Sequence, residues 1–200
     1  MKPHFLALLT AAVCLSGCWH SSLTNKQTPA KVAENKPKAL TFSLKDDSGK
    51  FSLPKGFKEV RTDDQCRLFV YDLRPFSDVD ITVKMKATPG KKDFGGGILF
   101  RFNDPNNYYC VRYNPGINNF RFYKSIKGDR ARFANRTVRL KDKTAWHELR
   151  LITRGDLLEA YIDGKRILFR EDELLKAGKV GLWVRGEESK TEFSDLVIRQ

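Results

Sequence analysis

The sequence predicts an all-β protein built as an antiparallel sandwich of two sheets. Short segments of alternating apolar residues follow one another after Ala39, separated by turn signals about every 8–12 residues. Fourteen Phe and six Tyr, against two Met, favour a sheet because aromatic rings pack well on pleated surfaces. Two hundred residues, of which 40% are hydrophobic, suffice for one domain with a core of its own.

Thirteen segments have the alternation, or the β-branched and aromatic content, of strands. They are Leu40–Leu44, Phe57–Val60, Arg67–Tyr71, Val79–Ala87, Gly96–Phe102, Tyr108–Tyr113, Phe120–Lys124, Ala131–Leu140, His147–Thr153, Leu158–Ile162, Arg166–Phe169, Val180–Val184 and Thr191–Arg199. Residues that preset a turn or tolerate positive φ separate them, at 103–107, 114–118, 127–129 and 163–164. We also expect one short helical turn, over Glu171–Ala177, and a single hydrophobic core.

The first 17 residues have the layout of an export signal. Lys2 supplies a positive start, an apolar run extends from Phe5 to Leu15, and two small residues follow it. The apolar run is shorter than the ~20 residues that a bilayer-spanning helix needs. We therefore expect residues 1–17 to be absent from the mature protein.

The tetrapeptide Leu15-Ser16-Gly17-Cys18 resembles the cleavage box of bacterial lipoproteins. The resemblance implies cleavage before Cys18, lipidation of its thiol and attachment to a membrane of the bacterial cell envelope. The alternative is an ordinary secretory signal with a Cys nearby. Residues 18–38, rich in Ser, Thr, Asn, Lys, Ala and Pro, are expected to form a flexible tether that leads to a β-sandwich domain over residues 39–200.

Two cysteines, Cys66 and Cys110, remain within the predicted domain. An exported chain meets an oxidising compartment, where an even pair of cysteines can form a disulfide. The alternative is two buried thiols, and the sequence leaves both open because it does not fix the distance between them. Neither Cys has the closely spaced Cys or His partners of a zinc site.

Four segments resemble bacterial concanavalin A-like jelly-roll domains: Gly95–Tyr109, Trp146–Arg150, Ala160–Gly164 and Gly178–Trp183. The resemblance covers about residues 75–199 and extends to laminin-G-like modules, legume-type lectins, laminarinase-like glucanases and 3-keto-disaccharide hydrolase-like domains. It implies a concanavalin A-like jelly roll with Trp146 inside the sandwich. Because this fold carries binders and enzymes alike, the resemblance does not fix the function.

Catalytic chemistry finds little support in the sequence. The laminarinase-like relatives need carboxylates spaced as Glu-x-Asp-x-x-Glu along one strand, and no such run occurs. No Gly-x-Ser-x-Gly elbow accompanies His147, the one His of the predicted domain. The acidic clusters at 78–80, 171–173 and 187–188 are typical of solvated surface charge. We expect a protein that is not an enzyme, with a glycan-processing enzyme of the 3-keto-disaccharide hydrolase-like type as the alternative.

The turn at 103–107 offers oxygen ligands that would suit calcium, from Asn103, Asp104, Asn106 and Asn107. The same residues, together with Pro105, favour an ordinary β-turn. We expect the turn, and hence no metal and no cofactor, with calcium kept as the alternative.

The formal net charge is +13, and residues 101–154 hold thirteen Lys or Arg against four Asp or Glu. This balance favours anionic partners. Alternation places in the core the apolar residues Ile98, Phe100, Phe102, Tyr109, Val111, Tyr113, Phe120 and Phe122. The predicted ligand-binding residues, which should share the opposite and solvent-facing side, are Arg101, Tyr108, Arg112, Arg121, Tyr123, Trp183 and Arg185.

Guanidinium groups pair with carboxylate and phosphate while aromatic rings stack on sugars, so this face suits an acidic glycan or another anionic envelope ligand. The alternative is a basic surface that binds nothing specific. Nucleic acid fits the same chemistry but is not expected as a partner of an exported lipoprotein. The sequence therefore predicts a lipid-anchored cell-envelope module that binds carbohydrate, with a module that docks to another envelope protein as a further alternative.

Overall fold

Alternating burial runs along two neighbouring strands, because successive side chains of a β-strand point to opposite faces. In β3 (Val79–Ala87) every second side chain, from Val79 to Ala87, is buried, whereas the polar residues between them are half-buried or exposed. Strand β8 (His147–Arg154) follows the same pattern over its first five residues. This pattern gives the sheet that contains β3 and β8 an apolar side that needs a partner layer.

The computed structural model describes residues 55–62, 66–88, 94–185 and 191–200, which belong to one unit, Lys36–Gln200. The predicted strand Leu40–Leu44, the export signal, Cys18 and the tether lie outside the described residues. Besides β3 and β8, the strands are β1 (Phe57–Thr62), β2 (Cys66–Tyr71), β4 (Gly96–Asp104), β5 (Asn107–Asn114), β6 (Asn119–Ile126), β7 (Asp129–Thr137), β9 (Leu157–Ile162), β10 (Lys165–Glu171), β11 (Lys179–Arg185) and β12 (Thr191–Arg199).

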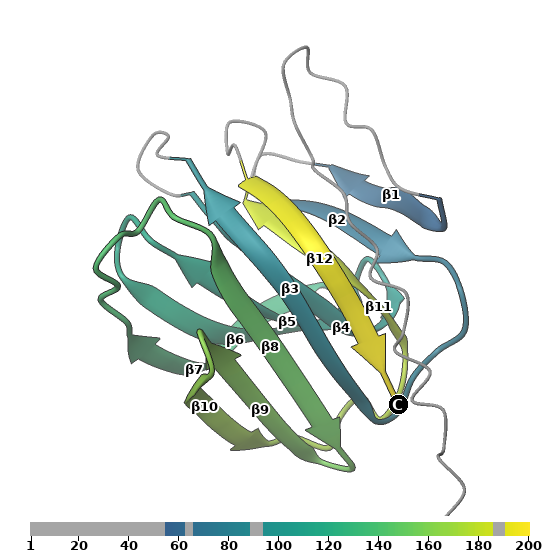
Figure 1. The fold of residues 1–200 in the computed structure, drawn as a ribbon. Helices are drawn as coiled ribbons and strands as arrows, with labels where there is room; N and C mark the ends of the chain where they lie inside the picture. Colours follow the sequence, from purple (N-terminus) through teal and green to yellow (C-terminus); the bar gives the residue numbers. More distant parts are fainter. Residues whose placement is uncertain (1–54, 63–65, 89–93, 186–190) are drawn as a thin grey trace, which may run out of the picture. The chain divides into compact units, whose positions relative to one another are not determined.

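Two antiparallel sheets face each other (Figure 1). The larger sheet has the strand order β1-β2-β11-β4-β5-β6-β7, and the smaller sheet, in front in Figure 1, has the order β10-β9-β8-β3-β12. All of the strand pairs within the two sheets are antiparallel. The prediction of a two-sheet antiparallel β-sandwich is confirmed.

The inner faces of the two sheets form the main hydrophobic core, with large rings such as Phe69, Phe100 and Phe122 from one sheet against Val83 and Leu151 from the other. A second buried cluster lies on the outer face of the larger sheet. Its members come from β2, β4, β5 and β11: Cys66, Leu68, Val70, Leu99, Phe102, Tyr108, Cys110 and Trp183. The expectation of a single core is therefore wrong.

The segment after β10 contains no helical residue, so the prediction of a helical turn over Glu171–Ala177 is wrong. The Asp172 carboxylate explains why, because it accepts hydrogen bonds from the Tyr109 hydroxyl, from Lys124 Nζ at 2.6 Å and from the Leu174 backbone N–H at 3.2 Å. These bonds fasten the segment to β5 and β6 and satisfy its polar groups without a helix.

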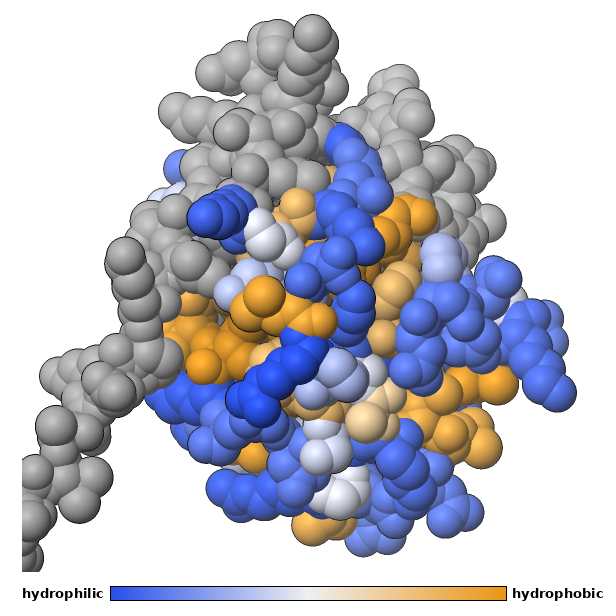
Figure 2. Space-filling view, turned by 90° about the vertical axis from the view of Figure 1, so that its right-hand side faces the viewer, coloured by the Kyte–Doolittle hydropathy of each residue, from blue (hydrophilic) through white to orange (hydrophobic). Residues whose placement is uncertain are grey.

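The surface on the side of β1 and β12 is mixed in character. Figure 2 shows hydrophobic areas on this side that hydrophilic side chains divide from one another. In the described part of the chain, the structure contains no helix of the length and apolarity that crossing a membrane requires.

Candidate functional site

Six of the seven predicted ligand-binding residues, all except Arg101, lie on the outer side of the larger sheet. Trp183 pairs with Gly97 across β11 and β4, Gly97 with Arg112 across β4 and β5, and Arg112 with Arg121 across β5 and β6. Tyr123 packs against the outer cluster that contains Tyr108 and Trp183. Arg185 follows Trp183 by two residues on β11, so alternation places it on the same face.

Gly97 determines how closely this row of side chains can pack. A Cβ at this position would lie 1.8 Å from the backbone oxygen of Val111, so the site excludes any larger residue. With no side chain between them, the guanidinium of Arg112 reaches over the Trp183 ring, 5.0 Å from its centroid. The same guanidinium lies 6.0 Å from the centroid of Tyr123.

Arg130 also belongs to this cluster, and the sequence-based prediction did not include it. Its guanidinium lies 4.1 Å from the ring centroid of Tyr123 and 5.1 Å from that of Trp183. The predicted strand begins at Ala131 and therefore leaves Arg130 out. In the structure β7 begins at Asp129, and Arg130 pairs with Ser125 of β6. Alternation counted from the turn at 127–129 would have placed it on this face. Two arginines thus flank the same two rings in a cation–π cluster.

Burial corrects the expectation that the whole face meets solvent. Trp183 is 0% exposed, Arg112 is 3% exposed and Tyr108 is fully buried. Arg121, Tyr123 and Arg130 are half-buried, and Arg132, which pairs with Tyr123 across β7 and β6 and so lies on the same face, is exposed. Alternation assigns a side chain to one face of a sheet, but it does not say whether that face is covered. The buried residues Trp183, Arg112 and Tyr108 therefore pack beneath this face. The groups that a ligand could reach are those of β6 and β7.

Arg101 lies elsewhere, contrary to the prediction. The pairing of β4 with β5 shifts register between Phe100 and Asp104, and Arg101 has a φ of 47°. Beyond this bulge the alternation reverses, so that Phe102 belongs to the outer cluster instead of the main core. The Arg101 guanidinium donates to the carbonyl oxygens of Leu175, at 2.7 Å, and Gly155, so it ties two loops together.

The two cysteines are free thiols, both buried, so the disulfide alternative does not hold in the structure. Cys66 lies on β2 and Cys110 on β5, and β11 and β4 separate these strands in the sheet. Three inter-strand spacings of ~4.8 Å exceed the Cα separation that a disulfide bridges. Burial raises the pKa of the Cys110 thiol to about 11, which keeps it protonated at neutral pH.

The turn at 103–107 is closed by its own side chains. One Asp104 carboxylate oxygen accepts hydrogen bonds from the Asn106 N–H at 2.7 Å and the Asn107 side-chain amide at 3.1 Å. The β-turn is therefore the arrangement observed here. Within the ranges that the structure describes, no three His, Cys, Asp or Glu side chains gather as a metal site would require.

An exposed tryptophan lies on the opposite side of the sandwich. Trp146 is 41% exposed, so the prediction that it is buried is wrong. It precedes β8, in which His147 points inward and Glu148 outward, and alternation puts Trp146 on the side of Glu148. It borders a hollow of about 350 Å³ whose other lining residues are Lys84, Glu148, Asp163, Ser194 and Asp195.

Charges around Trp146 are fixed by specific contacts. Lys84 Nζ lies 2.9 Å from Asp195 Oδ2, and this hydrogen bond raises the pKa of Lys84. Asp163 accepts the Glu148 backbone N–H at 2.9 Å and contacts His147 Nδ1 at 2.8 Å. Glu148 makes no ion pair within the described part of the chain.

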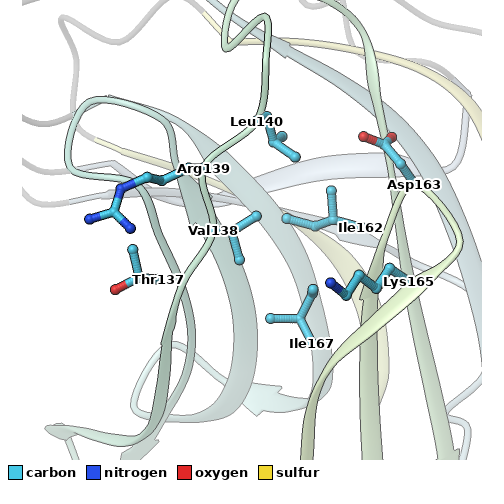
Figure 3. Close-up of a pocket in the computed structure, with 8 residues that line it drawn as sticks. All are labelled: Thr137, Val138, Arg139, Leu140, Ile162, Asp163, Lys165 and Ile167. Carbon is cyan, nitrogen blue, oxygen red and sulfur yellow. The ribbon is translucent and has the colours of Figure 1, made fainter.

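A second hollow of about 350 Å³ lies between the end of β7 and the hairpin of β9 and β10. In Figure 3, aliphatic side chains of Val138, Leu140, Ile162 and Ile167 point toward one another across it, while Arg139 points away. Its lining contains no aromatic ring on which a sugar could stack. We therefore do not assign it to the site.

No protein-family model matches the chain, and none of the curated proteins matches it either. Among solved structures, a carbohydrate binding module, CBM66, from Bacillus subtilis is similar with a TM-score of 0.66 and 18% identity, over 72% of this chain and 96% of that one. A protein of unknown function with a galectin-like fold, also from Bacillus subtilis, matches with a TM-score of 0.54 and 16% identity, over 72% and 86%.

A glycosidic hydrolase is similar with a TM-score of 0.53 and 13% identity, over 82% of this chain and 95% of the hydrolase. At such low identities the likeness concerns the backbone and shows neither ligand nor activity. The sheet order and these likenesses together show that the chain has the concanavalin A-like jelly-roll β-sandwich fold.

Proposed function

We propose that this protein is a carbohydrate-binding module that a lipid at Cys18 holds in the bacterial cell envelope. The likeness to a carbohydrate binding module and to a galectin-like protein supports a sugar ligand. The export signal and the Leu15–Cys18 box support the anchor. The ligand that fits the larger sheet best is an acidic glycan.

The observation that carries this proposal is the arginine-rich outer face between β5 and β7. Arg121 donates to the Asn135 side-chain oxygen at 2.8 Å and to the Tyr123 hydroxyl at 3.0 Å, which orients both groups. Within the described residues, no carboxylate forms an ion pair with Arg121, Arg130 or Arg132. Cations held close together without counter-charges repel, so an anionic ligand stabilises the face.

The outer face of the smaller sheet lacks this property, because its charges neutralise one another. Arg150 donates to both oxygens of Asp80, at 2.8 and 2.6 Å, and Arg166 pairs with Glu159 at 3.1 Å. Charge complementarity therefore supports the larger sheet as the surface that binds an acidic glycan.

The test is calorimetric titration of the full chain with an acidic polysaccharide, polygalacturonate. We expect binding that weakens steeply with salt and that falls about tenfold or more in an Arg121→Gln, Arg132→Gln double variant. Arg154→Gln, which removes a charge from an exposed arginine of the smaller sheet, is the matched control and should bind as the wild type does. Equal binding by the double variant and the control would overturn the assignment of this face.

Release of reducing ends from the same polysaccharide distinguishes the alternative of an enzyme. A pure binding module leaves the polymer intact at enzyme-scale concentrations of protein and over long incubation. Turnover by the wild type would replace the proposal with a glycan-processing activity on the same fold.

A further inference from the structure

We propose a second sugar-binding site, at Trp146 on the outer face of the smaller sheet, that takes an uncharged sugar ring. This site is independent of the arginine-rich face, because the two lie on opposite outer sides of the sandwich. Its parts are an exposed indole, a hollow beside it and polar side chains on four strands or their ends.

Trp146 differs from the other exposed large apolar residues of the described chain. Leu73, Ile117, Leu157, Phe169 and Leu174 are also exposed, but none of them lines either of the two hollows described above. A single apolar residue on a surface is ordinary. An indole in the wall of a hollow that polar side chains also line offers what a sugar needs, a flat apolar surface with hydrogen-bonding groups at its edge.

A bulge in β12 turns the carboxylate of Asp195 toward this hollow. The pairing of β12 with β3 shifts register between Ser194 and Val197, and Asp195 has a φ of 51°. A non-glycine residue rarely adopts this conformation, and a bulge redirects the side chain that it carries. Here the redirected carboxylate meets Lys84, and both groups line the hollow next to Trp146.

The size and polarity of the hollow fit one sugar unit. Its volume of about 350 Å³ is at the lower end of the range for small-molecule sites. Glu148 and Asp195 supply acceptors for sugar hydroxyls, and Lys84 and Ser194 supply donors. The directions of these hydrogen bonds, rather than net charge, would select the ligand.

Charge decides between sugar classes at this site. Among the described residues that line the hollow, one cation, Lys84, stands among three carboxylates, those of Glu148, Asp163 and Asp195. An acidic sugar would be repelled, in contrast to the larger sheet, where arginines predominate. The site therefore takes uncharged sugars, and the two faces of the sandwich discriminate between glycans in opposite ways.

Calorimetry of the full chain, in a detergent without a sugar headgroup, tests this inference with four uncharged probes: cellohexaose, laminarihexaose, maltohexaose and xylohexaose. We expect at least one to bind, with an affinity that stays the same in about 1 M salt, where charges are screened beyond ~3 Å. Trp146→Ala should weaken this binding about tenfold or more, and Trp146→Phe should retain part of it.

Phe169→Ala, which removes another exposed aromatic ring that lines neither hollow, serves as the matched control and should bind the uncharged probe as well as the wild type does. Failure of all four probes, or undiminished binding by Trp146→Ala, would overturn the second site. Neither result bears on the acidic glycan, whose binding is measured with a different polymer and different variants.

Discussion

The two tryptophans of the described domain occupy opposite environments, and their stability effects should differ accordingly. Trp183 is fully buried among Leu68, Leu99 and Tyr108, whereas Trp146 is 41% exposed. Trp183→Ala should lower the free energy of unfolding by about 3–5 kcal/mol. Trp146→Ala should change it by no more than about 0.5 kcal/mol, as surface substitutions do. Urea denaturation midpoints measure both, and equal shifts would contradict this assignment of environments.

Asp172 should make the stability of the domain depend on pH. Burial alone would raise its pKa, but hydrogen bonds from Lys124 and Tyr109 hold the pKa below its usual value. A carboxyl whose pKa is depressed by folding stabilises the protein above its unfolded pKa of about 3.9. That contribution is lost as pH falls through the lower, folded pKa.

We therefore expect Asp172→Asn to cost about 1.5–3 kcal/mol at pH 7, the usual range for a hydrogen bond to a charged group. The difference from the wild type should shrink as the pH falls below about 4. Denaturant titrations at several pH values measure this stability difference. The control is Asp129→Asn, because Asp129 is exposed and forms no ion pair with the described residues. A stability difference that is independent of pH would contradict the role given to the charge.

At the scale of the strands, Gly97 sets the spacing of β4 and β5. Gly97→Ala would place a Cβ against backbone, which cannot turn aside, so a loss of about 1–3 kcal/mol is expected. Gly116→Ala is the comparison, because the nearest atom there, at 2.7 Å, belongs to the Phe94 side chain, which can move. Thermal unfolding of the two variants compares them, and an equal or greater loss at Gly116 would refute the explanation.

Strand positions were predictable to the extent that alternation was regular. The bounds Val79–Ala87 and Thr191–Arg199 agree with β3 and β12, because apolar and polar residues alternate through β3 and a run of polar and small residues precedes β12 in the sequence. The direction of Arg101 was not predictable, since a bulge leaves no mark in the pattern of hydrophobic residues.

The candidate site was predictable in its placement but not in its accessibility. Alternation correctly put Arg112, Arg121 and Tyr123 on one face, because these residues lie in two strands joined by a short turn. Alternation could not show that Trp183 is buried by other residues, or that Trp146, which precedes β8, is exposed. Both depend on contacts between residues far apart in the chain.

At the scale of the whole molecule, the anchor is the feature to test. Cys18→Ala should block lipidation and signal removal, and the precursor should keep its full mass. Cys14→Ala, within the apolar run, should be processed as the wild type is. Membrane fractionation after a high-salt wash measures anchoring, because the wash removes a chain that is held by charge alone. A processed Cys18→Ala chain that stays with the membrane after this wash would exclude the lipid anchor.

The outer faces of the two sheets differ in charge, and this difference would orient the domain next to an anionic surface. Cations of β5, β6 and β7 lie on one outer side, and mutually neutralised charges lie on the other. Near an anionic polymer or membrane, the field would turn the domain so that the larger sheet faces the charged layer. The hollow beside Trp146 would then look outward, so that one electrostatic asymmetry decides which surface the protein displays to its surroundings.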